Sequence, residues 1–304
     1  MKRLRIFLII PMFLPVSCDL FFRNSGRSPY IAEVFEYRYG VGQHASLVVS
    51  GEEEKKFLGT DTGFVLLGGW GGYIVAGFDH DVFDGEGYDF AVYTQPGVGS
   101  EPAVVFVMAD ESGTGRPEGT WYELSGSETG KSYGPDDSYI RDYRVTFNKP
   151  DSEAGNITWT DNQGSSGELA PGYGDSSYHW WWSGYGTGVT EVEFSGARLP
   201  HNKYLDEGFW TDYPDRFLRG YGENYQGEDL LDVPFGSTTR RANRFDIGDA
   251  VDAEGNPVEL TSIRFIKIQT GVFMIAGELN EISTEVSGAV DLHALEDPAL
   301  REKP

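Results

Sequence analysis

The sequence predicts an all-β fold, a single large β-sandwich, and three observations lead to that prediction. Glycine accounts for 40 of the 304 residues, about twice its share in an average protein. Aromatic residues make up 14% of the chain, and short runs rich in them alternate with turn-forming residues. Long segments with apolar residues at helical spacing are scarce, so short strands joined by tight turns are the predicted elements.

The amino-terminal residues predict export from the cytoplasm. Three basic residues among the first five precede an apolar run that ends near Leu14, and small residues follow before Cys18. This is the pattern of a secretory signal peptide. The apolar run is far shorter than the roughly 20 residues that span a bilayer as a helix. We therefore predict a signal peptide over residues 1–17.

Cys18 is the one cysteine of the chain, so it has no partner for an intramolecular disulfide. With Val16 and Ser17 directly before it, Cys18 resembles the lipobox cysteine of bacterial lipoproteins. The resemblance implies cleavage before Cys18 and acylation of its sulfur and its new amino group, and several acyl chains anchor a protein stably. Residues 18–29 are then a lipidated tether. The alternative is a free secreted protein with one thiol.

The charge of the chain excludes one class of partner. The formal net charge is −24, and removal of a signal peptide with three basic residues and no acid changes it to −27. Such a surface repels phosphate backbones and anionic lipid head groups. We therefore expect no nucleic acid partner, and we expect the lipid at Cys18 to supply the link to the membrane.

The region after Tyr30 is predicted to form one domain of short strands. Turn sequences such as "GEG", "GPDDS" and "AEGNP" separate the strands, and their residues accept positive φ or preset a turn. No repeat of fixed period and no linker is present, so we predict one sandwich over residues 30–288 and a loose tail over residues 289–304. The predicted strands are residues 30–39, 64–67, 73–78, 89–93, 103–109, 120–125, 139–147, 190–194, 244–247, 263–270 and 281–286.

The stretch "YIVAGFDHDVFDGEGYDFAVY", residues 73–93, joins two apolar runs through an acidic segment. Every second residue from Ile74 to Phe78 shares one face of a strand, and residues 79–88 are predicted to be a loop. The acidic residues have two interpretations. In the first, they are turn residues of the loop that connects two strands, because Asp and Gly are common in turns. In the second, they help to bind a cation, which takes six or more oxygen ligands. The cation ligands would be Asp79, Asp81 or Asp89.

A sharper candidate for a metal site is "DESGTGRPE", residues 110–118. Asp110, Ser112 and Thr114 occupy the first, third and fifth positions of a calcium-loop pattern, and Gly115 occupies the sixth, where glycine permits the bend. The twelfth position is Trp121 rather than Glu, which excludes a standard EF-hand. Two interpretations stay open: a structural Ca²⁺ cofactor held by Asp110, Ser112 and Thr114, or a surface turn that leads into the next strand.

The run "SSYHWWWSGYG", residues 176–186, is the main candidate for ligand contact. In a strand, alternate residues point to opposite faces, so at least one of the three indole rings would lie near solvent. Exposed indole rings stack on a sugar ring or on a flat apolar ligand. Core packing is the alternative, because aromatic side chains supply much of the core area of β-sandwiches. The predicted ligand-binding residues are Tyr178, Trp180, Trp181 and Trp182.

Six blocks follow one another through most of the mature chain: "YIAEVFEYRYGVGQ" (30–43), "LGGWGGYIVAGFDH" (67–80), "GYDFAVY" (87–93), "SEPAVVFVMADESGTGRPEGTWYELSGSETG" (100–130), "WTDNQG" (159–164) and "FDIGDAVDAEGNPVELTSIRFIKIQTGV" (245–272). Together they resemble a family of bacterial surface lipoproteins described as cell surface proteins. The middle blocks are similar to exported proteins with a jelly-roll, galactose-binding-like domain. The resemblance implies a β-sandwich that binds ligands at the cell surface, often for uptake of cobalamin or glycans, and it brings no catalytic motif.

Motifs for catalysis are absent from the sequence. No pair stands out among the 48 acidic residues as a glycosidase pair, no nucleophile elbow is present, and the five histidines show no zinc-ligand spacing. We therefore predict a lipoprotein of the outer membrane or cell surface that binds a glycan or a small nutrient and is not an enzyme. The alternatives are a glycan-processing hydrolase and a structural or adhesion protein of the envelope.

Overall fold

The computed structural model describes residues 27–42, 53–61, 63–95, 99–152, 155–172, 182, 185–186, 188–277, 279–295 and 297–304. This part of the chain is all-β, with antiparallel sheets and three short 3₁₀ helices, as the sequence predicts. The helices are η3 (Glu53–Phe57), η6 (Ile247–Asp249) and η7 (Pro298–Arg301). None of the described helices is long and apolar enough to cross a bilayer.

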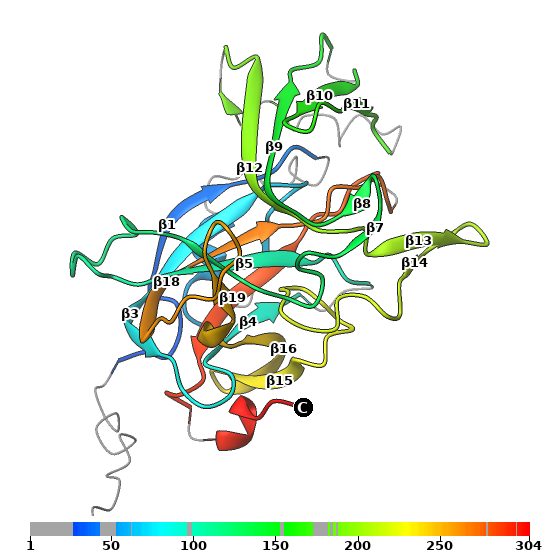
Figure 1. Cartoon of the computed structure of the whole chain (residues 1–304). Helices are drawn as coiled ribbons and strands as arrows, with labels where there is room; N and C mark the ends of the chain where they lie inside the picture. The colour runs from blue at the N-terminus through cyan, green and yellow to red at the C-terminus, as the bar shows by residue number, and fades with distance from the viewer. Residues whose placement is uncertain are drawn as a thin grey trace, which may run out of the picture.

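Two large sheets face each other and form the sandwich (Figure 1). The six-stranded sheet has the order β1 (Glu33–Arg38), β3 (Tyr73–Phe83), β18 (Ser262–Thr270), β5 (Ala103–Met108), β6 (Tyr122–Leu124) and β17 (Ala250–Val251). The five-stranded sheet has the order β15 (Leu230–Phe235), β16 (Thr238–Phe245), β4 (Phe90–Thr94), β19 (Glu285–Asp291) and β2 (Val65–Leu66). From β1 to β5 the strands alternate between the two sheets, so consecutive strands lie on opposite sides of the sandwich.

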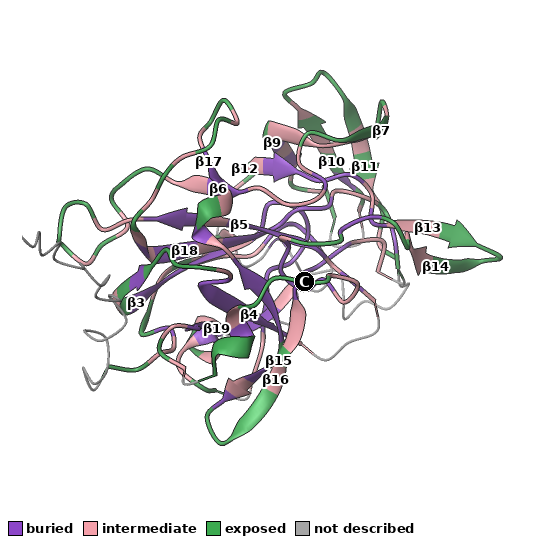
Figure 2. Ribbon diagram, turned by 60° about the horizontal axis from the view of Figure 1, so that its bottom comes forward, coloured by how far each residue is buried: buried purple, intermediate pink, exposed green. Residues whose placement is uncertain are grey.

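One apolar core fills the space between the two sheets. Ile74, Ala76 and Phe78 of β3 lie in it, so the predicted face of this strand is confirmed. Phe90 and Val92 of β4 reach the same core from the opposite sheet. Figure 2 shows the central strands as buried, with exposed residues gathered in the connecting loops. The core explains the alternation of apolar residues in these strands, since each strand turns one face toward the other sheet.

The acidic stretch differs from the prediction in where its strand ends. Strand β3 continues to Phe83, so Asp79 and Asp81 lie on a strand rather than in a loop. The strand continues because Val82 is fully buried in the core and pairs with Ile263 of β18. That pairing joins segments far apart in the sequence, and the local pattern of residues 79–88 does not reveal it.

A smaller sheet lies at one end of the sandwich (Figure 1). Its order is β11 (Ser166–Leu169), β10 (Ile157–Asp161), β9 (Ile140–Asn148) and β12 (Glu191–Arg198). It has its own apolar core, which Trp70 from the sandwich joins. Two hairpins complete the described structure, β13 (Lys203–Asp206) with β14 (Phe209–Asp212) and β7 (Ser132–Gly134) with β8 (Asp137–Ser138).

The carboxy-terminal segment is packed, which corrects the expectation of a loose tail. The predicted boundary at residue 288 falls inside β19, and Leu292 and Leu300 are buried. The backbone amide of Tyr88 donates to the carbonyl of Arg301 at 2.8 Å. Arg244 donates to the carbonyls of Leu300 and Glu302. These three hydrogen bonds and the two buried leucines hold the carboxy-terminal segment against the five-stranded sheet. The sequence did not predict them because the hydrogen bonds join residues far apart in the chain.

Candidate ligand-binding cleft

A cleft of about 370 Å³ lies at one end of the sandwich, where the two sheets meet the carboxy-terminal segment. Leu124 of β6 lines it from the six-stranded sheet, and Phe245 of β16 lines it from the five-stranded sheet. We call its tyrosine and its charged side chains the cleft residues. They are Tyr88, Arg219, Glu228, Arg244, Asp246, Asp249 and Lys303.

Two ion pairs lie in this cleft. Nη1 of Arg219 is 3.3 Å from Oδ2 of Asp249, and Nζ of Lys303 pairs with Oδ2 of Asp246. The other oxygen of Asp246 accepts a hydrogen bond from the amide of Gly248 at 2.6 Å, which caps η6. The side chains of Arg219 and Lys303 are about half exposed, at 50% and 45%. Both cations can therefore turn toward a ligand at little conformational cost.

Arg244 lies at the base of the cleft and is only 6% exposed. Its Nε donates to the carbonyl of Asp229 at 3.0 Å, and its guanidinium group lies 4.6 Å from the ring centre of Tyr88. Burial lowers the pKa of Arg244 from its ordinary value, and Tyr88 and Asp229 oppose that effect. Within the described residues no carboxylate lies within 4 Å of Arg244. A buried cation without a carboxylate partner favours an anionic group on a ligand.

Asp246 of the cleft also belongs to a group of three aspartates with Asp84 and Asp89, and one oxygen of each lies within 4.8 Å of the others. Asp89 is fully buried, and its oxygens accept hydrogen bonds from the amides of Gly85 and Ile247. Burial, followed by repulsion from Asp89 and Asp246, raises the pKa of Asp84. Asp89 therefore connects the residue before β4 with the loop at Gly85 and with Ile247, which follows β16. Its role is structural.

The other acidic residues of that stretch lie elsewhere. Asp79 contacts Nδ1 of His80 at 2.7 Å, and Nε2 of His80 contacts Asp291 at 2.9 Å. Asp81 lies 3.8 Å from Nη1 of Arg264. Of the three candidate cation ligands, the structure thus places Asp89 with two other aspartates, and it gives Asp79 and Asp81 side-chain partners on the sheet.

The loop of the predicted calcium site closes through its own hydrogen bonds. Asp110 accepts from the amide of Thr114 at 3.1 Å, from the amide of Gly115 at 2.8 Å and from the hydroxyl of Ser112 at 3.2 Å. Nη1 of Arg264 lies 3.6 Å from the same carboxylate. Asp110, Ser112 and Thr114 are thus neighbours in space, and these contacts account for the turn. Calcium at this loop stays a prediction.

Trp182 packs inside the protein. It is 6% exposed, its indole nitrogen donates to the carbonyl of Val189 at 2.8 Å, and its ring meets Tyr185 edge-on at 5.3 Å. For this ring the core-packing interpretation is the one that the structure supports. Tyr178, Trp180 and Trp181 lie outside the described residues, as do Cys18 and the signal peptide. Ligand contact by these three aromatic residues and lipidation of Cys18 stay predictions.

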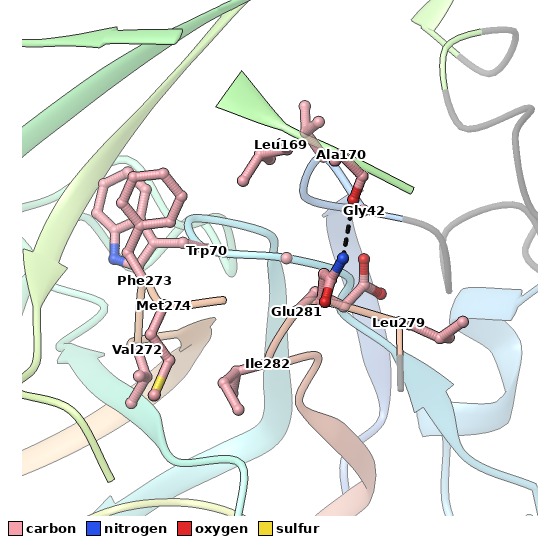
Figure 3. Close-up of a pocket in the computed structure, with 13 residues that line it drawn as sticks. Gly42, Trp70, Leu169, Ala170, Val272, Phe273, Met274, Leu279, Glu281 and Ile282 are labelled. Atoms are coloured by element: carbon pink, nitrogen blue, oxygen red, sulfur yellow. Dashed lines mark hydrogen bonds between the residues drawn. The ribbon is translucent and has the colours of Figure 1, made fainter. Parts of the chain in front are cut away.

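A second hollow lies between the end of β11 and residues 272–282 (Figure 3). Trp70, Leu169, Phe273 and Met274 are among the residues that line it, and a hydrogen bond of 3.2 Å from Asn280 to the carbonyl of Ala170 crosses it. Its volume of about 20 Å³ is room for a single water molecule. The hollow is too small for a sugar, so the cleft at the opposite end is the better candidate.

No protein-family model matches the chain, and no curated protein matches it.

Sequence reasoning missed the cleft residues. Tyr88, Arg219, Arg244 and Lys303 lie in four separate segments, and none of them belongs to a spaced motif. One signal was present: the chain has 24 Lys and Arg against 48 Asp and Glu, so each basic residue is conspicuous. The fold alone shows that three of these basic residues meet in one cleft.

Proposed function

We propose that this chain is a non-catalytic surface lipoprotein that binds a glycan or another small polar nutrient, held at the cell envelope by acylated Cys18. The cleft between the sheet ends is the observation that carries the proposal. Clefts of roughly 300–1,000 Å³ with a few convergent polar groups are typical of small-molecule sites, and this one has about 370 Å³.

The chemistry of the cleft supports a sugar with a carboxylate group. Sugar hydroxyls donate and accept hydrogen bonds, and the cleft offers both the cations Arg219 and Lys303 and the carboxylates Asp246 and Asp249. Arg244 adds a buried positive charge in a protein whose net charge is −24. An acidic sugar would neutralise this charge, and its carboxylate can accept a charge-assisted hydrogen bond from the guanidinium group.

The ion pairs favour binding over hydrolysis. A glycosidase needs one carboxyl group that holds a proton and a second that is free to act as nucleophile or base. Burial raises the pKa of Asp249, whereas Lys303 and Arg219 oppose that rise. Asp246 is bound to Lys303 and to the amide of Gly248. Both carboxylates therefore have structural partners, and hydrolysis is the rival outcome in the test.

The test is calorimetric titration of the mature chain with neutral and uronic-acid-containing oligosaccharides. We expect an acidic oligosaccharide to bind, and Arg219→Gln and Lys303→Gln each to weaken its binding roughly tenfold to a hundredfold, because a hydrogen bond to a charged group contributes about 1.5–3 kcal/mol. Both side chains are about half exposed, so the substitutions leave the fold intact.

Arg144→Gln is the matched control, because the Arg144 side chain is similarly exposed, at 48%, and lies on β9 of the smaller four-stranded sheet, outside the cleft. It should leave the affinity unchanged. Equal loss of affinity in all three variants, or no loss in the two cleft variants, would contradict a site in this cleft. Release of reducing ends during the incubation would favour the hydrolase, and lack of affinity for every oligosaccharide would favour the structural or adhesion role.

A further inference from the structure

Three glutamates from distant segments meet outside the cleft. Glu101 precedes β5, Glu223 lies in the loop before β15, and Glu285 begins β19. One carboxylate oxygen of each lies within 4.8 Å of the other two. Glu223 is only 2% exposed. We call these residues the glutamate cluster.

Backbone contacts hold the glutamate cluster together. The amide of Glu101 donates to the carbonyl of Glu223 at 3.1 Å. The amide of Ser283 donates to Oε2 of Glu101 at 3.1 Å, and the amide of Glu285 donates to Oε2 of Glu223. The backbone amides of Ser283 and Glu285 thus hold the carboxylates of Glu101 and Glu223, and a main-chain hydrogen bond joins the segments that carry Glu101 and Glu223.

Carboxylates this close are costly in the absence of a compensating ion. Burial raises the pKa of all three, repulsion from Glu285 adds to the rise for Glu101 and Glu223, and a side-chain hydrogen bond between Glu223 and Glu285 lets these two carboxyl groups share a proton in the absence of an ion. Lys203 lowers the pKa of Glu101, and its Nζ already lies 2.6 Å from Asp212. Buried charges are ordinarily paired or coordinate a metal.

A buried hydroxyl without a hydrogen-bond partner lies on the segment that carries Glu285, and it is an independent observation. The hydroxyl of Ser283 has no partner, and Ser283 is 1% exposed. The bond from the amide of Leu67 to the carbonyl of Thr284 continues the ladder between β19 and β2. Residues two apart on an extended chain point to the same side, so the Ser283 hydroxyl faces the side of the Glu285 carboxylate.

Gln95 supplies a second oxygen of this kind. Its Oε1 is buried and has no partner. Thr94 of β4 pairs with Val286 of β19, so Gln95 stands opposite Glu285 in the antiparallel register. Side chains opposite each other on paired strands share a face. A buried acceptor oxygen without a donor, on the residue opposite Glu285, is available as a ligand of a cation.

We propose that Glu101, Glu223 and Glu285 bind one divalent cation, and that Ca²⁺ is the ion of best fit. Three carboxylate oxygens within 4.8 Å of one another can contact one ion, and Ca²⁺ takes six to eight oxygen ligands in flexible geometry. Mg²⁺ demands near-ideal octahedral geometry and usually keeps several of its waters, so a site built mainly from protein oxygens fits it less well. The hydroxyl of Ser283 and Oε1 of Gln95 are further ligands, and the ion joins the starts of β5 and β19 to the loop of Glu223.

The test is a calorimetric melt of the chelator-treated mature chain with and without Ca²⁺, and it involves no sugar, so its failure is separate from failure of the proposed function. We expect Ca²⁺ at about a hundred times its dissociation constant to raise the transition temperature by roughly 5 °C, and Mg²⁺ to raise it less. Glu223→Gln keeps an acceptor for the amide of Glu285 but removes the charge, and it should abolish most of the shift.

Asp110→Asn is the matched control, because it alters the other acidic loop and should keep the full shift. Glu101→Gln is the second cluster variant, for use if Glu223→Gln does not fold, and it should lose the shift as well. The absence of a calcium shift in the unaltered chain would overturn the proposal. A shift that survives in the cluster variants, or that Asp110→Asn alone removes, would overturn it too.

Discussion

Lys267 is a partly buried cation in the middle of β18. Its Nζ lies 4.5 Å from the ring centre of Tyr73 and 5.3 Å from that of Phe106. Burial lowers the pKa of Lys267 to about 8, and Glu36 opposes this effect. The rings stabilise the ammonium group, but less than the water that they replace. The charged ammonium group of Lys267 therefore lowers the free energy of unfolding at neutral pH.

We predict that Lys267→Met raises the free energy of unfolding at pH 7 by about 1–3 kcal/mol, because each unit of pKa shift corresponds to about 1.4 kcal/mol. The folded-state pKa of about 8 lies below the unfolded value. Between pH 8 and about pH 10.4 the unfolded chain therefore binds more protons, and stability rises with pH through that window.

Urea unfolding at pH 7 and pH 9.5 measures both effects. In Lys267→Met the increase in the free energy of unfolding between pH 7 and pH 9.5 should be smaller than in the unaltered chain. Lys149→Met, at an exposed position, should show the same increase as the unaltered chain. An identical pH trend in the Lys267→Met variant would show that this ammonium group is not the cause.

The turn before β3 is the element that joins the sandwich to the smaller sheet. Its sequence "LGGWGG" spans residues 67–72, and Trp70 packs edge-on against Tyr143 of β9 at 4.9 Å. Backbone segments approach each other closely at this turn. A Cβ on Gly72 would lie 1.8 Å from the carbonyl oxygen of Leu67 and 2.2 Å from the backbone nitrogen of Gly40. Both neighbours are backbone atoms, which cannot rotate away.

We predict that Gly72→Ala lowers the free energy of unfolding by at least about 3 kcal/mol, because overpacking against backbone is among the most damaging substitutions. Gly164→Ala is the control. Gly164 has a φ of +86° but no atom within 4 Å of an added Cβ, so the cost should be about 1 kcal/mol. Thermal melts of the two variants compare the costs, and equal shifts would refute the steric explanation.

The elements show which parts of the structure were predictable. The face of β3 from Ile74 to Phe78 follows from alternation within five residues, and it is confirmed. The continuation of β3 to Phe83 depends on the pairing of Val82 with Ile263, and the sequence alone does not predict that long-range pairing. The cleft escaped prediction for the same reason, because Arg244 and Lys303 meet only after the carboxy-terminal segment packs.

The whole molecule combines an acidic β-sandwich with a predicted export and lipidation signal. A net charge of −24 keeps the domain away from anionic head groups, so the proposed attachment depends on the lipid. We predict that the full chain, expressed in bacteria with a labelled fatty acid, incorporates the label and sediments with membranes. Cys18→Ala should lose the label and release the chain. Label in Cys18→Ala, or an unlabelled unaltered chain, would refute the anchor.

Binding in the cleft without chemistry predicts a specific pattern in a saturation-transfer NMR titration with an acidic oligosaccharide, which reports contact and cleavage in the same sample. We expect transfer to the sugar protons from the unaltered mature chain, loss of transfer with the Arg219→Gln and Lys303→Gln double variant, and constant anomeric signals over hours. New reducing-end signals, or full transfer from the double variant, would show that the cleft is not a simple binding site.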